Sequence, residues 1–304
     1  MARRRIVTAL AVTGLVFVAC FMAILGFLVL AERGDLALGG NRVALVEVEG
    51  LIWDADRVVR ELEDHAEDPA IRAVVVRVQS PGGVVGPTQE IHDAIRRARD
   101  RGKPVVASLG AIAASGGYYL AVAADRIVAN PGTLTGSIGV LMQLAEVEGL
   151  LKKVGVHFEV IKAGRHKDIG NFARPMTTEE RAILQALLDD IYDQFVNAVV
   201  EGRHLPRAAV LELADGRVYS GRRAKELGLV DELGGLEDAV RAAGVLAQIR
   251  GKPRLVRPRR PWSLSDLFDW VGGTTSLGGL LAGRGAGPGL PLPGAAKLPL
   301  YLME

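Results

Sequence analysis

The sequence contains a single cysteine, Cys20, among 304 residues. An intrachain disulfide is therefore impossible, and a zinc site built from several cysteines is excluded. Aromatic residues make up only 5% of the chain, and the formal net charge is only +2. A net charge so close to zero gives no reason to expect nucleic acid as a partner. Charged residues nevertheless make up 24% of the chain, which is ordinary for a folded domain.

Several common catalytic motifs are also missing. The sequence has no Gly-x-x-x-x-Gly-Lys-Ser/Thr phosphate loop and no His-Glu-x-x-His zinc helix. It has no Gly-x-Ser-x-Gly nucleophile elbow either, and the best serine candidate instead reads Ala113-Ala114-Ser115-Gly116-Gly117. We therefore expect chemistry that uses no cofactor and no metal ion.

One long hydrophobic run is present near the N-terminus. Residues 6–31 carry no charge, and 22 of these 26 residues are apolar. A helix of this length would span about 39 Å, enough to cross a hydrocarbon core of about 30 Å. Three arginines precede the run and acidic residues follow it, so the positive-inside rule places residues 1–5 in the cytoplasm and the rest outside. The sequence thus predicts a single-pass anchor in the cell membrane; a cleaved signal peptide would have a shorter apolar run.

The body that follows, residues 32–271, is predicted to be one extracytoplasmic domain. β-Branched and apolar runs predict strands at 43–48, 71–78, 104–109, 126–129 and 156–161. Helical spacing predicts helices at 54–64, 88–101, 115–123 and from 177 to about 200. This alternation indicates an α/β fold, a mainly parallel sheet with crossover helices. Residues 272–304, rich in glycine and proline over 272–294, are predicted to form a flexible tail.

Two glycine-containing turns follow buried strands of this predicted sheet. One is Ser80-Pro81-Gly82-Gly83, and the other contains Ser115-Gly116-Gly117. The carboxyl ends of parallel strands are where sites form in such folds, and glycine pairs let the backbone approach a ligand closely. Either turn alone is weak evidence, because a glycine pair after a strand is usually a plain turn.

A polar loop at 162–171 supplies a possible base for Ser115. Lys167 in this loop and Ser115 would form a nucleophile–base pair. A lysine amine with an ordinary pKa of about 10.4 is protonated at neutral pH, so such chemistry requires a dry pocket that favours the neutral amine. The alternative, a Ser-His-Asp triad with His166 and Asp168, is disfavoured because these two residues are too close in the loop for one to orient the other easily.

Five ordered motifs resemble the signal peptide peptidase SppA family, in its short form with one catalytic domain. The resemblance covers residues 43–247 and rests on Ser-Pro-Gly-Gly (80–83), Ala-Ala-Ser-Gly-Gly-Tyr-Tyr (113–119), Thr-Gly-Ser-Ile-Gly-Val (135–140), Lys-x-Gly-x-x-Lys-Asp (162–168) and Gly-x-x-Ala-x-x-x-Gly-Leu-Val-Asp (221–231). It implies a ClpP/crotonase-like spiral of α/β type. It further implies a short strand beside the site that pairs with an extended peptide.

The resemblance also implies a role for each matching residue. Ser115 corresponds to the nucleophile, Lys167 to the general base and Ser137 to the hydroxyl that orients the lysine. Backbone groups of Gly82, with Gly83 and Gly116, correspond to the oxyanion hole. The implied substrates are signal peptides or other hydrophobic peptides, cut beside the membrane by a ring-like homo-oligomer.

Two other functions remain compatible with such a fold. Acyl-CoA chemistry would use the same kind of backbone oxyanion hole, but the sequence offers no obvious site for the CoA phosphates, and the predicted location outside the cytoplasm is hostile to it. A catalytically silent membrane scaffold would have no need to retain Ser115, Lys167 and Ser137 together. Labelling of Ser115 by an acylating reagent would separate a peptidase from a scaffold, and retention of CoA would favour the acyl-CoA enzyme.

Overall fold

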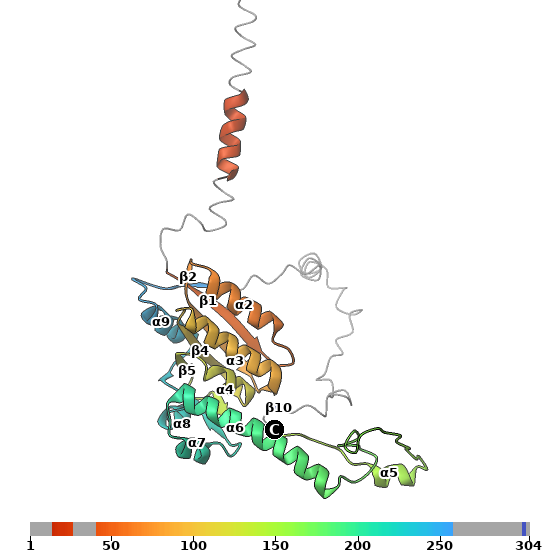
Figure 1. Cartoon of the computed structure of the whole chain (residues 1–304). Coiled ribbons are helices and arrows are strands. Elements are labelled where there is room, and N and C mark those ends of the chain that lie inside the picture. The colour runs from red at the N-terminus through yellow and green to blue at the C-terminus, as the bar shows by residue number, and fades with distance from the viewer. Residues whose placement is uncertain (1–13, 27–40, 258–299, 302–304) are drawn as a thin grey trace, which may run out of the picture. The chain divides into compact units, whose positions relative to one another are not determined.

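The computed structural model describes residues 14–26, 41–257 and 300–301 (Figure 1). The chain divides into two units, Met1–Gly40 and Asn41–Glu304. In the first unit, residues 14–26 are helical and their side chains are exposed. The described part of the chain contains no helix that is both long enough and apolar enough to cross a membrane. The predicted span at 6–31 lies partly outside the described residues, as does most of the predicted tail.

The second unit is built on a mixed, mostly parallel sheet. Its central strands are β1 (Arg42–Glu49), β2 (Ile71–Ser80) and β4 (Val105–Ala114), which pair in parallel. The described strands form the order β7-β6-β4-β2-β1-β9; off this path, β5 pairs with β4, and β8 pairs with β5. The remaining bounds are β5 (Arg126–Ala129), β6 (Leu134–Gly136), β7 (Val218–Ser220), β8 (Glu232–Leu233) and β9 (Arg254–Val256). Only β6 and β7 run antiparallel among the described pairs of this sheet.

The helices connect and cover these strands. Between the first strands lie α2 (Asp56–Glu67) and α3 (Val85–Asp100), and α4 (Gly116–Ala121) follows β4 directly. The later helices are α5 (Glu148–Lys153), α6 (Thr178–Arg203), α7 (Arg207–Leu213), α8 (Gly221–Glu226) and α9 (Leu236–Leu246). The predicted α/β alternation is confirmed, and the parallel strands with crossover helices fit a ClpP/crotonase-like fold. The predicted start of the long helix is also confirmed, since Thr177 and Glu180 form a capping box at α6.

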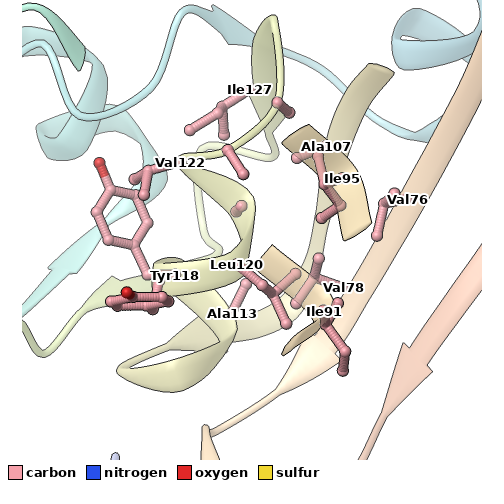
Figure 2. Close-up of a cluster of buried hydrophobic side chains, with 14 of the residues drawn as sticks. Val76, Val78, Ile91, Ile95, Ala107, Ala113, Tyr118, Leu120, Val122 and Ile127 are labelled. Carbon is pink, nitrogen blue, oxygen red and sulfur yellow. The ribbon is translucent and has the colours of Figure 1, made fainter. Parts of the chain in front are cut away.

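Both faces of the central sheet are buried, and alternate residues of each strand point to opposite faces. On β1, Val43 and Leu45 belong to the cluster covered by α9, whereas Ala44 and Val46 belong to the larger cluster beneath α2, α3, α4 and α6. Figure 2 shows part of the larger cluster, where Val76 and Val78 of β2 lie beside Ile95 and Ile91 of α3. Burial on both faces explains why β1 and β2 read as continuous apolar runs rather than as alternating ones.

Strand β4 changes partners along its length. Its first half pairs with β5, from Val106 to Leu109, and its last residues pair with β6, from Ile112 to Ala114. The change falls at Gly110, where an added Cβ would collide with the side chain of Gln79. Strand β4 therefore extends five residues beyond its predicted end at 109 and delivers Ser115 to the edge where β6 ends.

Helix α4 lies against the end of β2 so closely that it requires glycine. A Cβ added to Gly117 would lie 2.7 Å from the carbonyl oxygen of Ser80, which is backbone and cannot swing aside. The helix starts immediately after Ser115, so its position also fixes the position of that serine.

We expect the substitution Gly117→Ala to push α4 away from β2 and to destabilise the fold by about 1–3 kcal/mol, the usual cost of overpacking a core. Thermal unfolding measures this effect. Gly86→Ala is the matched control, because Gly86 lies in α3 with no atom within 4 Å of its added Cβ, and there we expect no loss of stability. Equal melting temperatures for the two variants would contradict the close packing at Gly117.

The predicted strand at 156–161 is wrong. These residues form no strand, and the side chains of Val156, Phe158 and Ile161 are exposed. The alternation of apolar and polar residues is typical of a strand, but no other described strand lies beside this segment to pair with it. Figure 1 shows that the segment carrying α5 extends away from the sheet.

A second, two-stranded sheet lies next to the end of β2. Strand β3 (Gly83–Val84) pairs antiparallel with β10 (Leu300–Tyr301), with Tyr301 opposite Gly83 and Leu300 opposite Val84. On its other side, β3 forms a bridge with Ile52. Two residues from the predicted tail thus occupy one edge of β3.

Candidate active site

Ser115 occupies a sharp turn between β4 and α4. Its backbone has φ 52° and ψ −120°, a positive φ that is uncommon for a residue with a side chain. The turn is held by its hydrogen bonds: the N–H of Ser115 donates to Gly136 at 2.8 Å, and its carbonyl accepts from Tyr118 and Tyr119 at 2.9 and 2.8 Å. Backbone strain of this kind persists only where the surroundings over-determine it, and it concentrates at functional sites.

The hydroxyl of Ser115 is buried and has no partner. The residue is fully buried, and its Oγ accepts and donates no hydrogen bond within the described structure. A buried polar atom without a partner is costly and rare in native proteins, and a catalytic role is one of its few explanations. This oxygen is therefore the first candidate for the reacting atom.

Ser137 lies beside Ser115 at the same edge of the sheet. Ala114 of β4 pairs with Gly136 of β6, and each serine is the next residue along its chain. Ser137 is only 5% exposed, has φ 50°, and donates its N–H to Arg217 at 2.9 Å. The structure thus brings together the two serines that lie 22 residues apart in the sequence.

The glycine turn after β2 reaches the same edge, because Ser80 pairs with Ala113. Gly82 has φ 115°, donates its N–H to Ser80 Oγ at 3.1 Å, and accepts from Ile52 at 3.0 Å. Gly83 begins β3, and an added Cβ there would collide with the backbone of Ile52. Gly116 is the first residue of α4, where an N–H has no partner within its own helix. The three predicted oxyanion glycines therefore lie in the turn after β2, at the start of β3 and at the start of α4.

Lys167 is not brought to this edge within one chain. It lies in a turn segment after the exposed residues 156–161, and it is itself exposed. Because Ser115 Oγ has no hydrogen-bond partner, the lysine amine does not contact it. The lysine also makes no side-chain hydrogen bond or ion pair with any described residue, whereas the other cations of its loop are all paired.

These paired cations form a network that fixes the loop. Arg174 donates to Asp168 at 3.0 Å and to Glu180 at 2.8 Å, and Lys162 also pairs with Asp168. Hydrogen bonds from Arg174, and then Lys162, hold the pKa of the Asp168 carboxyl well below its usual range. The hydrogen bonds from Arg174 and the backbone of Thr177 lower the pKa of Glu180 to about 2.

The ion pairs of this network exclude a Ser-His-Asp triad through His166 and Asp168. The Nε2 atom of His166 lies 3.6 Å from Glu179, and both oxygens of Asp168 are engaged by Lys162 and Arg174. Asp168 therefore does not orient His166 in this structure. Nor does any group of three or more histidine, cysteine or carboxylate side chains in the described ranges form a possible metal site.

A groove of about 950 Å³ opens beside Ser137. Its walls come from residues 139–142, from α6 and from the segment before β7. Half of its lining residues are apolar: Val140, Leu141, Met142, Leu188, Tyr192, Ala214 and Val218. No sequence pattern indicates this groove, because its lining residues come from three separate segments.

The fold and these residues define a class of protein. A buried serine at a strained strand-to-helix turn, with glycine backbone and a second hydroxyl beside it, is the arrangement of a serine-type hydrolase on an α/β scaffold. The absence of a Gly-x-Ser-x-Gly motif separates it from the α/β-hydrolase elbow.

Comparison with known proteins identifies the family. Residues 97–250 match peptidase family S49. A protein of Synechocystis sp. named as a protease is 48% identical over 209 residues, which cover 68% of this chain and 75% of that protein. A similarly named protein of Methanocaldococcus jannaschii is 39% identical over 81% of this chain and 76% of its own length. A protein of Enterococcus faecium named for signal peptide peptidase SppA is 39% identical over 62% of this chain and 55% of its own length.

The chain belongs to peptidase family S49, the SppA family, and is a serine-type peptidase. This confirms the resemblance seen in the five sequence motifs. The match begins at residue 97 and so includes the segments of Ser115, Ser137 and Lys167.

Proposed function

We propose that this protein is a membrane-anchored endopeptidase that cuts signal peptides or other hydrophobic peptides with a Ser115–Lys167 dyad. The observation that carries the proposal is the buried, unpartnered Oγ of Ser115 on a strained turn. Ser137 would orient the lysine, and Gly83 and Gly116 would supply backbone N–H groups to the oxyanion. Gly82 would join them when its N–H leaves Ser80 Oγ, to which it donates in this structure.

The reaction proceeds through an acyl-enzyme. The neutral amine of Lys167 takes the hydroxyl proton as Ser115 Oγ attacks the scissile carbonyl carbon. Backbone N–H groups stabilise the tetrahedral oxyanion, an effect of about 3–4 kcal/mol for one donor. The protonated lysine then gives its proton to the leaving amine, and afterwards it activates the water that hydrolyses the ester and regenerates Ser115.

A second copy of the chain supplies the lysine in this proposal. Within one chain, Lys167 is exposed, and so are several apolar side chains between α5 and Lys167. The segment that carries α5 extends from the body (Figure 1). Ile161 on this segment is 94% exposed, and Phe158 is 56% exposed. Apolar surface of this extent favours burial against a partner. A head-to-tail contact of this kind closes into a ring, which is the homo-oligomer that we propose.

The membrane anchor is the charge-free run at 6–31. Residues 14–26 within it are helical, with exposed apolar side chains such as Leu15 and Phe17. The arginines before the run support a cytoplasmic N-terminus and an extracytoplasmic catalytic domain. Such an anchor would hold the site next to peptides that remain in the bilayer.

The groove beside Ser137 supports hydrophobic substrates. Its apolar walls would accept apolar side chains of an extended peptide. Of its two carboxylates, Asp215 is paired with Arg217 and Asp189 accepts a hydrogen bond from Gln185. The experiment is to incubate the full chain in detergent with a set of signal peptides and to map the cleaved bonds by mass spectrometry. We expect cuts within the apolar stretch. Absence of cleavage in every hydrophobic peptide, or cuts confined to polar segments, would contradict the proposed substrate class.

The edge of β3 would bind the substrate backbone, and β10 now occupies it. Removal of residues 300–304 should therefore lower the apparent KM several-fold with little change in kcat, because a tethered competitor acts at an effective concentration of about 1 mM. Steady-state kinetics on a fluorogenic peptide measures the change. Removal of 302–304 alone is the matched control, since it keeps β10. An unchanged KM after the longer deletion would show that β10 does not compete with substrate.

A further inference from the structure

The loop of Lys167 is tied to the start of α6 through a single guanidinium group. Arg174 donates from Nε to Asp168 Oδ2 at 3.0 Å and from Nη1 to Glu180 Oε2 at 2.8 Å, and its Nη2 reaches Glu180 Oε1. A planar guanidinium that binds two carboxylates in this way fixes both in distance and in direction. Asp168 is the residue immediately after Lys167, so the link acts next to the lysine backbone.

Both carboxylates are shielded and both are anchored elsewhere. The side chain of Asp168 is 11% exposed and that of Glu180 is 5% exposed. Glu180 accepts the N–H of Thr177 at 3.0 Å within the capping box, so its position is set by the rigid first turn of α6. Asp168 also accepts from Lys162, and its carbonyl accepts from Asn171 at 3.1 Å. The chain on the C-terminal side of Lys167 is thus fixed to a helix.

Lys167 differs from the other cations of this loop, because its amine forms no ion pair with a described residue. The loop places Lys162, Arg165 and Arg174 in ion pairs with Asp168, Glu179 and Glu180. The amine of Lys167 has no partner among the described residues, although a carboxylate follows it directly in sequence. A network that satisfies every neighbouring cation and leaves one amine free holds that amine available for another contact.

We propose that Asp168, Arg174 and Glu180 form a positioning cluster that fixes Lys167 for proton transfer and sets the charge around its amine. Arg174 is the central positioning residue, because among the residues that the structure describes it alone joins Asp168 of the loop to Glu180 of α6. The inference rests on the proposed function, in which Lys167 is the general base. None of the three residues need touch the substrate.

The two carboxylates of the cluster are ionised at neutral pH, because their pKa values are lowered. The pKa values of Asp168 and Glu180 lie below those of free carboxyl groups. The ion pairs therefore stabilise the fold fully above about pH 4 and lose that contribution only as the pH falls through the lowered pKa values. Changes in activity near neutral pH do not come from titration of the cluster itself.

The test uses two substitutions that cut the cluster with opposite changes in charge. Arg174→Gln removes a positive charge and leaves two carboxylates near Lys167, whereas Asp168→Asn removes a negative charge and leaves the Arg174–Glu180 pair in place. We expect each to lower kcat by about 10-fold to 100-fold with KM changed less than about twofold, because a displacement of about 1 Å at a catalytic group has effects of this size.

The pH profile separates positioning from simple stability. The other charged groups around Lys167 are Lys162, Arg165, His166 and Glu179, and they are the same in both variants. Arg174→Gln favours the protonated amine of Lys167, so we expect the rising limb of kcat/KM to move to higher pH. Asp168→Asn removes a negative charge and favours the neutral amine, so there we expect the limb to move to lower pH. Arg223→Gln is the matched control, since it breaks an exposed arginine–glutamate pair of 2.8 Å on α8. It should leave both kcat and the pH limb unchanged.

Two results would overturn the inference while leaving the proposed function intact. One is wild-type kcat and an unmoved pH limb in folded Arg174→Gln, when Lys167→Ala is inactive. The other is a loss of activity that is fully explained by a lower melting temperature, while the rising limb of kcat/KM stays at the wild-type pH in both variants. That result would assign the cluster a purely structural role. Full activity of Lys167→Ala, by contrast, would contradict the proposed function itself.

Discussion

Replacement of Ser115 by alanine is expected to lower kcat for peptide cleavage by about 10³-fold or more, since removal of the nucleophile of a serine peptidase has effects of at least this size. The hydroxyl oxygen of Ser115 is the atom that would form the acyl-enzyme. The measurement is steady-state cleavage of a hydrophobic peptide by the full chain in detergent.

The same substitution should not harm the fold. Within one chain, Ser115 Oγ is buried without a hydrogen-bond partner, so its removal breaks no intrachain hydrogen bond and relieves the burial of an unpaired polar atom. We expect the melting temperature to stay the same or to rise. A buried polar atom without a partner lowers the stability of the fold, so its presence in a native structure indicates a function at that position.

Ser220→Ala provides a matched control with the opposite pattern. Ser220 Oγ caps α8 by accepting the N–H of Arg223 at 3.2 Å, so its loss should destabilise the fold by about 1 kcal/mol and leave activity unchanged. The pair of variants thus separates activity from stability. Peptidase activity in Ser115→Ala close to that of the wild type would contradict its role as nucleophile, whatever the melting temperatures show.

The central strands could be predicted from the sequence because they are buried on both faces. Strands β1, β2 and β5 stand out as short β-branched runs, and glycine and proline mark where the chain turns between them. The segment at 156–161 has the same kind of pattern, and there the prediction failed. Alternation shows that one side of a segment is apolar, but it does not show which surface will cover that side.

The arrangement around Ser115 was predictable for a related reason. Ser115, Ser137 and Gly82 all follow strands of one sheet, and parallel strands end at a common edge. The place of Lys167 is not determined by the sheet, because its loop is fixed by ion pairs and extends from the body. The ion pair between Arg174 and Glu180 could not be predicted from the sequence. A capping sequence predicts where a helix starts, but it does not predict that its glutamate also binds an arginine.

Substitution of Lys167 by alanine is expected to abolish peptidase activity to nearly the same extent as Ser115→Ala, because residues that act as a unit in catalysis are not additive. Without a neutral amine, the hydroxyl of Ser115 has no group to take its proton. In the wild type, activity should rise with pH as the base loses its proton, and a flat profile from acid to alkali would contradict a lysine base. Lys152→Ala is the control, since Lys152 lies on α5 of the same segment and pairs with Glu148 at 2.9 Å.

Mixing the two inactive chains tests where the lysine comes from. Ser115→Ala retains Lys167, and Lys167→Ala retains Ser115, so co-assembled rings would contain some sites with both groups if neighbouring copies share a site. With random assembly in equal amounts, about one site in four would regain the pair. We therefore expect coexpressed chains to recover roughly a quarter of wild-type activity, measured after purification through two different tags. No recovery in verified mixed assemblies would place Lys167 and Ser115 of each site on the same chain and would require the exposed loop to fold back onto its own serine.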